Sequence, residues 1–282
     1  MLILGATPIG NLGDASRRLI EALGSAPVIA SEDTRTTRRL LAALGVESSA
    51  RLIPLHEHNE REQADSVVEL ARDADVLLLT DAGMPTVSDP GFALVRAAVA
   101  AGVTVTILPG ASAVLSALAV SGLPTDRFCF EGFLPRKPQA RRQALAALRG
   151  EPRTIVAFES PNRLAEALAD IVTSMGADRQ VVVCRELTKL HEEIVRGTAE
   201  EVAARFADGA RGEICLVIAG ADPVASDPDA ELARVLELVA AGARLKDAAG
   251  VVGAESGISA RELYQAALSS KNRSSKAPAP RS

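Results

Sequence analysis

Short apolar runs alternate with amphipathic segments along the first part of the chain. The runs predict strands at 2–5, 28–30, 52–55, 76–80 and 103–108. Between them, segments such as "SRRLIEAL" and "FALVRAAVAAG" repeat apolar residues at the spacing of a helix face. Alternation of buried strands with amphipathic helices is typical of an α/β domain.

The same alternation resumes after Gly122. Apolar runs stand in "FCFEGF", "TIVAFES", "QVVVCREL", "EEIVRGT" and "EICLVIAG". The runs at 181–184 and 193–197 follow each other with no helix between them, which favours a mixed second sheet. The turn residues of "SGLPTDR" at 121–127 predict a hinge between two α/β domains.

A third region is entirely helical. "GADPVASDPDAE" at 220–231 has the composition of a linker, and helical spacing runs from Ala230 onward. "LKDAAGVVGAESGISARELYQAAL" predicts two helices joined at Gly257, with Ser259 and Glu262 spaced as a capping box. Such a pair could bind nucleic acid or could be purely structural, and the pattern does not decide between them.

These patterns predict a protein of the α/β class with four parts. They are an N-terminal α/β domain at 1–120, a second α/β domain at 121–222, a helix-turn-helix-like region at 223–270 and a disordered basic tail at 271–282.

Composition narrows the functional classes. With 282 residues, 48% of them hydrophobic, the chain can bury a large core. No apolar run approaches the roughly 18 residues of a membrane span, and the N-terminus lacks the features of a signal peptide, so we expect a cytoplasmic protein. Cys129, Cys184 and Cys215 lie in or beside apolar runs without CxxC spacing, which indicates reduced core thiols.

Charge is unevenly distributed over a chain whose net charge is -5. Residues 134–153 carry six basic residues and one acidic residue, and the tail from Lys271 carries four basic residues and none that is acidic. Such segments suit contact with RNA, although a solvated surface has the same composition. With 2% aromatic residues, no Trp and only Tyr264 as tyrosine, a platform of stacked bases is not expected.

Three loops lead from a predicted strand to a predicted helix. In "TDAGMPTVSDPG" at 80–91, Asp89 fits a helix N-cap and Pro90 the first helical position. "LPGAS" enters a helix near Ser112, and "FESPN" enters one with Pro161 in its first turn. Open α/β sheets bind ligands at the carboxyl ends of their strands, where free N–H groups favour anionic groups.

Common nucleotide-binding loops are absent. "GATPIGNL" from Gly5 has the glycine spacing of a P-loop but carries Asn11 and Leu12 where Lys and Ser or Thr are needed. No GxGxxG follows the first predicted strand, which excludes the signature of a dinucleotide-binding fold. The loops alone therefore predict only a small ligand in an α/β cleft.

A set of segments resembles the tetrapyrrole methylase superfamily. They are "ATPIGNLGD" at 6–14, "SEDTRTTRRLL" at 31–41, "LHEHNE" at 55–60, "TDAGMPTVSDPG" at 80–91, "LPGASAVLSALAVSGLPTDRFCFEGFLPRK" at 108–137, "FESPNRL" at 158–164 and "RELTKLHEE" at 185–193. They are most similar to the branch that methylates the ribose 2'-hydroxyl of a cytidine in 16S ribosomal RNA of the small subunit. Met84, Phe158 and Asn162 depart from the usual Thr, Tyr and His.

The resemblance implies two α/β domains with S-adenosyl-L-methionine in the cleft between them, and a homodimer. The residues that it places around this methyl donor are Pro8, Asp81, Gly83, Met84, Val87, Ser88, Pro109, Ser112, Ala113, Phe158, Leu187 and Thr188. Asp81 is expected near polar groups of the donor, and Gly83 and Met84 offer backbone near the sulfonium. Small residues permit close backbone approach, and apolar residues suit the adenine ring.

Methylation of a ribose hydroxyl needs positioning together with a base or a cation near the hydroxyl. Lys189, Glu192 and Glu159 are the candidates, although each could equally form an ordinary ion pair. The residues expected to contact substrate RNA are Arg35, Arg38, Arg39, His56, His58, Arg136, Lys137 and Arg185. The alternating histidines could suggest a metal, but His191 is the only other histidine and the family pattern implies none.

Two other classes remain open. A methylase of a tetrapyrrole precursor, a corrin or a porphyrin, would use the same donor cleft. A binding protein without catalysis would need no donor at all. The basic segments and the "EDTRTTRRLL" and "HEHNE" motifs favour RNA as the substrate.

Overall fold

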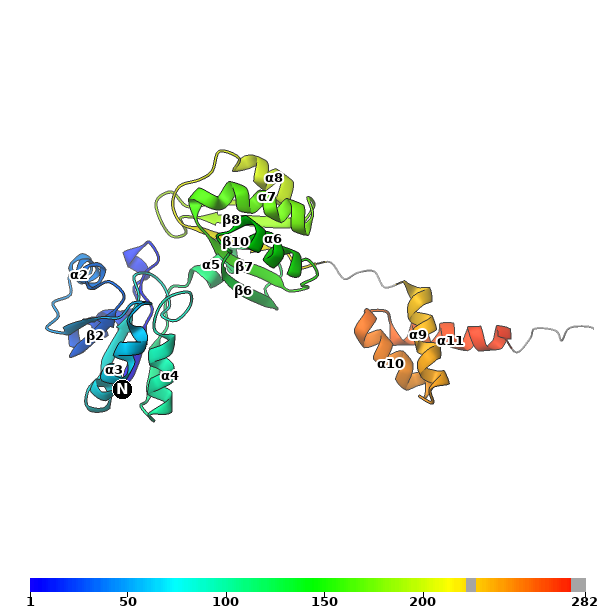
Figure 1. Cartoon of the computed structure of the whole chain (residues 1–282), viewed down its shortest axis with the longest axis horizontal. Helices are drawn as coiled ribbons and strands as arrows, with labels where there is room; N and C mark the ends of the chain where they lie inside the picture. The colour runs from blue at the N-terminus through cyan, green and yellow to red at the C-terminus, as the bar shows by residue number, and fades with distance from the viewer. Residues whose placement is uncertain (222–226, 275–282) are drawn as a thin grey trace, which may run out of the picture. The chain divides into compact units, whose positions relative to one another are not determined.

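The computed structural model describes residues 1–221 and 227–274 of the chain. The chain divides into two compact units, Met1–Gly220 and Ala221–Ser282, and each is described by itself (Figure 1). The predicted domain 1–120 and all but the last two residues of the predicted domain 121–222 fall within the first unit. In the described residues no helix is long and apolar enough to cross a membrane.

The N-terminal half of the first unit is built on a five-stranded parallel sheet. Its strands are β1 (Leu2–Gly5), β2 (Val28–Ser31), β3 (Arg51–Pro54), β4 (Val76–Leu79) and β5 (Val105–Leu108), in the order β3-β2-β4-β1-β5. The helices are α1 (Arg17–Ser25), α2 (Thr34–Ala43), α3 (Glu60–Asp73) and α4 (Phe92–Ala100), with a 3-10 turn, η1 (Leu12–Asp14). All five strands overlap the apolar runs that predicted them.

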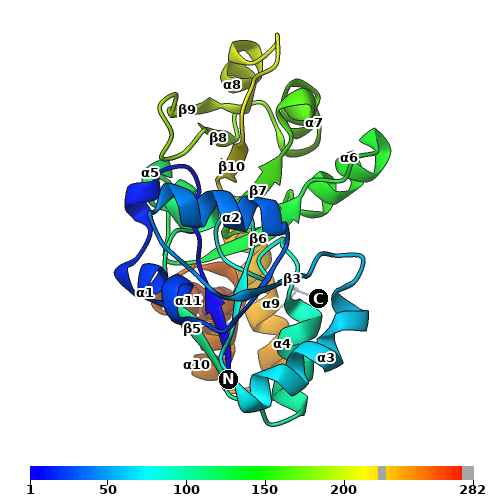
Figure 2. The same cartoon turned by 90° about the vertical axis from the view of Figure 1, so that its left-hand side faces the viewer.

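Helices cover both faces of this sheet (Figure 2). Val67, Ala71 and Leu94 of α3 and α4 pack with one set of strand residues, and Leu19 and Leu23 of α1 pack with the other. Because both faces are covered, every residue of β2 and β4 is buried. The carboxyl ends of the parallel strands consequently share one edge, where the loops after β1, β2, β4 and β5 emerge.

The strand β5 begins two residues later than its apolar run predicted. Val103 belongs to the end of α4 instead, because its N–H donates to the carbonyl of Ala98. Gly102, with φ of 69°, makes the turn between the helix and the strand.

The second half of the unit carries a mixed sheet, as predicted. Its strands are β6 (Phe128–Phe133), β7 (Thr154–Glu159), β8 (Gln180–Arg185), β9 (Glu193–Thr198) and β10 (Ile214–Ile218), in the order β6-β7-β10-β8-β9. Only β6 and β7 run parallel, and the other neighbours are antiparallel. A short loop joins β8 to β9, which is why no helix separates their two apolar runs.

The two faces of the mixed sheet have different roles. Helices α6 (Pro138–Ala147), α7 (Leu164–Met175) and α8 (Ala199–Arg205) cover one face, and the 3-10 turn η2 (Pro161–Arg163) leads into α7. Helix α5 (Ala113–Ser121), which follows β5, packs against the other face at β7, β8 and β10. This second face is directed toward the N-terminal half.

The second unit is a set of three helices, α9 (Pro228–Ala240), α10 (Leu245–Ser256) and α11 (Ala260–Ser274). Val235, Val252 and Leu263 contribute one residue from each helix to its core. Gly257, with φ of 75°, ends α10, as the sequence predicted. Residues 222–226 of the predicted linker lie outside the described residues.

The end of α11 differs from the sequence prediction. The helix continues to Ser274, four residues into the segment that was expected to be disordered. The first proline of that segment is Pro278, so nothing in its sequence breaks the helix before that point. The remainder, 275–282, lies outside the described residues.

Two glycines of α10 allow a matched test of the turn between α10 and α11. A Cβ atom at Gly253 would lie 2.8 Å from the Ile258 carbonyl oxygen, whereas a Cβ atom at Gly250 would meet nothing within 4 Å. We expect Gly253→Ala to destabilise the helical unit by about 1–3 kcal/mol and Gly250→Ala to stabilise it by about 0.5–1 kcal/mol. Amide hydrogen exchange across 228–270 in the full chain measures both, and equal effects would contradict this packing.

Candidate active site

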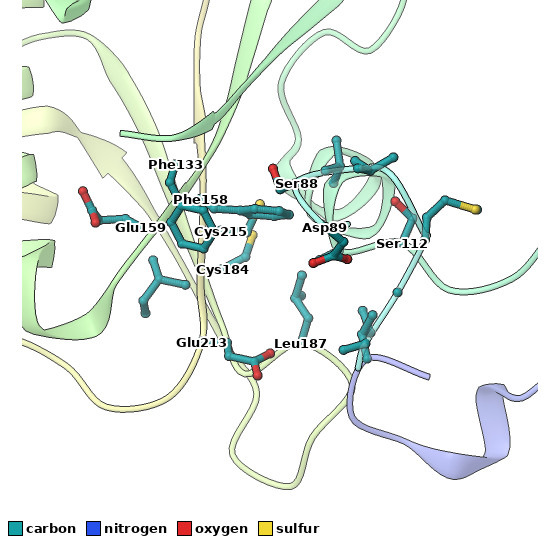
Figure 3. Close-up of a pocket in the computed structure, with 18 of the residues that line it drawn as sticks. Ser88, Asp89, Ser112, Phe133, Phe158, Glu159, Cys184, Leu187, Glu213 and Cys215 are labelled. Atoms are coloured by element: carbon teal, nitrogen blue, oxygen red, sulfur yellow. The ribbon is translucent and has the colours of Figure 1, made fainter. Parts of the chain in front are cut away.

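A cavity of about 430 Å³ lies between the carboxyl edge of the parallel sheet and the second face of the mixed sheet (Figure 3). One side consists of the loop after β4 and the start of α5. The opposite side consists of the end of β7, the end of β8, the start of β10, and Leu187 and Glu213. The cavity lies entirely within the unit Met1–Gly220.

A pair of backbone hydrogen bonds joins the loop after β1 to the loop after β4. The N–H of Thr7 donates to the Gly83 carbonyl at 2.9 Å, and the N–H of Gly83 donates to the Thr7 carbonyl at 3.1 Å. Both backbone groups of Gly83 are therefore engaged with Thr7 rather than offered to a ligand. Gly83 has φ of 79°, a conformation that glycine adopts without strain.

Strained backbone is concentrated in two loops that face the cavity. In the described residues, the non-glycine residues with positive φ are Thr86 (75°), Ser88 (63°), Glu186 (53°) and Thr188 (66°). Each pair flanks one apolar residue, Val87 or Leu187, that lines the cavity. Such residues cost roughly 1–3 kcal/mol each and tend to gather at functional sites. The sequence gives no signal for this feature, since none of these residues is glycine, Asn or Asp.

Cross-strand neighbours form the apolar wall of the cavity. Cys215 of β10 pairs with Phe158 of β7 on one side and with Cys184 of β8 on the other. Burial raises the pKa of Cys184 to about 11 and raises that of Cys215 further, so both thiols are neutral. The cysteines are free, as predicted, but two of them line the cavity, which was not predicted.

Charged groups fix the loop between β8 and β9. The Nζ of Lys189 lies 2.8 Å from Glu186 and 3.1 Å from Glu213, and the N–H of Thr188 donates to Glu192 at 2.7 Å. Partial burial alone would lower the pKa of Lys189, but the bonds to the two carboxylates outweigh it and raise that pKa. Lys189 is therefore charged and fully engaged, and neither Lys189 nor Glu192 lines the cavity.

Glu159 is among the residues that line the cavity, but its carboxylate lies on the far side of strand β7. It accepts a hydrogen bond from the N–H of Ser160 at 2.6 Å and forms an ion pair with Arg163. Figure 3 shows its side chain directed away from the centre of the cavity. Burial raises its pKa, and the Ser160 N–H and Arg163 oppose that rise. Alternate residues of a strand face opposite sides of the sheet, so the Glu159 carboxylate lies on the side opposite to Phe158. There it binds the Ser160 N–H and Arg163, which is a structural role.

Asp89 is not the helix N-cap that the sequence predicted. Helix α4 begins at Phe92 with Gly91 as its N-cap, and the carboxylate of Glu60 accepts the Gly91 N–H at 2.6 Å. An acid from α3 thus caps α4, and Asp89 lines the cavity instead. Burial, and next the charge of Glu32, raises the pKa of Asp89 to about 7.

The expected donor-binding residues fall into two groups. Those that line the cavity are Gly83, Met84, Val87, Ser88, Ser112, Ala113, Phe158 and Leu187. Those that do not are Pro8, Asp81, Pro109 and Thr188. Asp81 is exposed, and its N–H donates to Glu32 at 3.3 Å.

The cavity is also lined by residues that the sequence analysis did not assign to it. They are Ile9, Ala82, Asp89, Val114, Phe133, Ser160, Pro161, Cys184, Gly212, Glu213, Ile214 and Cys215. Strand alternation is the signal that could have placed Cys184 and Cys215 on the same face as Phe158. For Gly212 and Glu213 no signal was present, because the antiparallel course of β10 alone brings them to the cavity.

The residues expected to contact RNA also differ in their availability. Arg38 and Arg39 on α2 are exposed, as are Arg136 and Lys137 between β6 and α6, and no ion pair to any of them is found in the described residues. The remaining candidates have partners of their own: Arg35 binds Asp33 with two nitrogens, Arg185 lies 2.9 Å from Glu193, and the rings of His56 and His58 meet edge to face with centroids 6.0 Å apart. Arg35 lowers the pKa of Asp33 to about 2.

Part of the basic segment at 134–153 is not surface. Arg141 is 1% exposed and forms ion pairs with Asp170 at 2.7 Å and Glu166 at 3.2 Å, which ties α6 to α7. Within the described residues, no group of three or more His, Cys, Asp and Glu side chains is placed to hold a metal ion.

Residues 1–203 match the model of the protein family described as Tetrapyrrole (Corrin/Porphyrin) Methylases. The chain belongs to this family. Residues 226–271 of this methylase match a second family model, described as the RsmI C-terminal HTH domain. The fold and the resemblance expected from the sequence are thereby confirmed.

Relatives match this methylase over nearly its whole length. A protein of Mycobacterium tuberculosis (strain CDC 1551 / Oshkosh) named ribosomal RNA small subunit methyltransferase I is 50% identical over 272 residues, which cover 96% of this chain and 95% of that protein. A protein of the same name from Escherichia coli O157:H7 is 42% identical over 271 residues, covering 95% and 94%.

A solved structure shares the fold of this methylase. The crystal structure of diphthine synthase matches with a TM-score of 0.60 at 20% identity, covering 78% of this chain and 90% of that one.

The contact between Glu60 and Gly91 allows a test of how the loop after β4 is held. A hydrogen bond to a charged group contributes roughly 1.5–3 kcal/mol, so Glu60→Ala should speed amide exchange near Gly91 by at least about tenfold. Glu62→Ala is the control, because Glu62 is an exposed acid in the same first turn of α3. Equal exchange in both variants would show that Glu60 does not hold the loop.

Proposed function

We propose that this protein transfers a methyl group from S-adenosyl-L-methionine to the ribose 2'-hydroxyl of a cytidine in 16S ribosomal RNA. The observation that carries the proposal is the 50% identity, over 96% of the chain, to a protein named ribosomal RNA small subunit methyltransferase I. The cavity gives independent support, because it combines an apolar wall with few polar groups between two sheets.

The residues that line the cavity fit the methyl donor. Phe158 and Leu187 offer apolar surface for an adenine ring, and Phe158 is itself held by Phe130 and Phe133 at centroid distances of 5.0 and 5.5 Å. Ser112 and Ala113 stand at the N-terminal end of α5, where backbone N–H groups favour a carboxylate such as that of the donor. Both thiols are neutral, so neither presents a thiolate that would compete with the hydroxyl for the methyl group.

The bound donor supplies a methyl group that positively charged sulfur has already activated. The protein then has to hold the ribose hydroxyl in line with that methyl group and exclude water. We assign Lys189 and Glu192 to the fixed loop that presents Leu187, since their bonds hold its strained backbone. Glu159 supports the same cavity through the Ser160 N–H and Arg163.

Several features outside the cavity belong to the same proposal. Exposed basic residues on α2 and before α6 suit the phosphates of RNA in the small ribosomal subunit. Phe92 and Val99 of α4 are 63% and 64% exposed, which suits the homodimer implied by the resemblance. Small ribosomal subunits as substrate place the reaction in the cytoplasm.

A methylation assay tests the function. We expect the protein to transfer labelled methyl from S-adenosyl-L-methionine to small subunits from a strain that lacks the activity, on one cytidine. Alkaline hydrolysis should fail to cleave the chain after that nucleotide, because its 2'-hydroxyl is blocked. Label on a base, or on a porphyrin or corrin precursor and not on RNA, would contradict the proposal.

Salt dependence tests the RNA-contacting surface. Replacing Arg38, Arg39, Arg136 and Lys137 together by Gln should reduce the slope of log affinity against log salt by about 3, because each phosphate contact contributes roughly 0.7 to 0.9. Arg51→Gln is the control, because Arg51 is an exposed residue at the start of β3, at the amino ends of the parallel strands. Calorimetry should show unchanged donor affinity, and an unchanged slope in the quadruple variant would remove these residues from the RNA surface.

A further inference from the structure

Asp89 lines the cavity, is not the helix N-cap that its sequence position suggested, and has no role in the proposed function. Figure 3 shows its carboxylate directed into the space between Phe158 and Leu187. It comes directly after Ser88, one of the strained residues, and directly before the buried Pro90. The backbone of this loop therefore determines the direction of the Asp89 side chain.

The loop is closed on both sides of Asp89. The N–H of Thr86 donates to the Pro90 carbonyl at 3.3 Å, which spans the residue, and the carboxylate of Glu60 binds the N–H of Gly91. Because Glu60 caps helix α4, Asp89 is released from the capping role that its sequence position suggested. Thr86 and Ser88 keep their strained backbone, and in this conformation the Asp89 carboxylate faces the cavity.

Several charged groups surround Asp89. They are Glu32 at the end of β2, with His56 near it, Asp81 in the same loop, Glu60 behind Gly91, and Glu213 across the cavity with Lys189 bound to it. No ion pair to Asp89 is found among the described side chains, because the cations of the neighbouring loops bind other acids. Asp89 thus lies near acids and has no cation to fix its charge.

We propose that Asp89 is the general base that accepts the proton of the ribose 2'-hydroxyl during methyl transfer. The inference rests on the proposed function. In the step, the O–H bond breaks and its proton moves to the Asp89 carboxylate, while the 2'-oxygen forms a bond to the methyl carbon. The bond between that carbon and sulfur breaks, and its electron pair stays on sulfur, which becomes a neutral thioether.

The other candidates are less suitable as bases. Lys189 is a charged ammonium bound by two carboxylates and has no lone pair to offer. Glu192 is engaged with the Thr188 N–H, and Glu159 points away from the cavity. Glu213 also lines the cavity, but its carboxylate is paired with Lys189. Asp89 faces the cavity without an ion-pair partner, and a base whose pKa is near the working pH transfers protons most effectively.

The test compares single-turnover methyl transfer at saturating donor from about pH 5.5 to about pH 9. Wild-type rate should rise with pH and level off above about pH 7, since only the ionised carboxylate accepts a proton. Asp89→Asn should lower the rate by about 100-fold or more and remove this inflection, with donor affinity by calorimetry within about threefold of wild type. Glu69→Gln, which removes an exposed acid from α3, should leave rate and profile unchanged.

Glu32→Gln gives a second readout that a purely structural role would not produce. Glu32 lies outside the cavity lining and raises the pKa of Asp89 through its charge. Its removal should shift the inflection of the pH–rate profile to lower pH while the plateau rate is retained. If the inflection does not move, the pH dependence of the rate does not arise from Asp89, and the proposal is overturned.

The ligand-free protein gives a readout independent of activity. The folded pKa of Asp89, about 7, lies above the ordinary value of 3.8, so its stabilising contribution is present in acid and is lost as pH rises through 7. The Tm of Asp89→Asn relative to wild type should therefore increase by about a few degrees from pH 5 to pH 8.

The possible outcomes separate this inference from the proposed function. If wild type methylates the subunit and Asp89→Asn does so at a similar rate, the base is overturned and the function stands. If Asp89→Asn loses donor affinity together with rate, Asp89 is an anchor for the cationic donor, and the base is again overturned. If wild type transfers no methyl to RNA, the proposed function and the base that rests on it both fail.

Discussion

The paired backbone hydrogen bonds between Thr7 and Gly83 are the contact on which the cavity depends. Parallel strands place the loops after β1 and β4 side by side, but adjacency alone leaves each loop free to move. The two hydrogen bonds join them as an antiparallel bridge at the carboxyl edge of the sheet. This bridge fixes the start of the 81–91 loop, and the Glu60–Gly91 contact fixes its end. Strain at Thr86 and Ser88 can persist only because both ends are held.

The second sheet meets this edge with a matching arrangement. Leu187 lies between two residues with positive φ, as Val87 does. Two loops from different sheets thus each direct one apolar side chain into the same cavity. The bonds of Lys189 and Glu192 hold the second loop as the Thr7 bridge and Glu60 hold the first. Most ion pairs near the cavity therefore hold backbone in place.

The apolar pattern of the sequence predicted the architecture well, because buried strands and amphipathic helices are set by local periodicity. Every strand of both sheets was located, and the mixed second sheet followed from the missing helix between β8 and β9. The site was predicted less completely. Asp89 was misassigned because a local capping pattern cannot reveal that Glu60, 29 positions earlier, takes that role. Which face of β7 holds Glu159, and which loop β10 carries to the cavity, depend on tertiary pairing that no local motif records.

The distribution of charge explains how an acidic protein can serve both a cationic donor and an anionic polymer. Lys189, Arg163 and Arg185 are each neutralised by a carboxylate close to the cavity, while Arg38, Arg39, Arg136 and Lys137 remain exposed outside it. Asp89 lines the cavity, and Glu32 and Asp81 lie near it, so this part of the structure has an excess of acidic groups. Under the proposed function, these acids would favour the positive sulfonium and the exposed basic residues would favour the phosphates of RNA, so the two substrates would be separated by the sign of their charge. A count of basic residues in the sequence would overstate the exposed basic surface, because Arg141 is buried against Asp170.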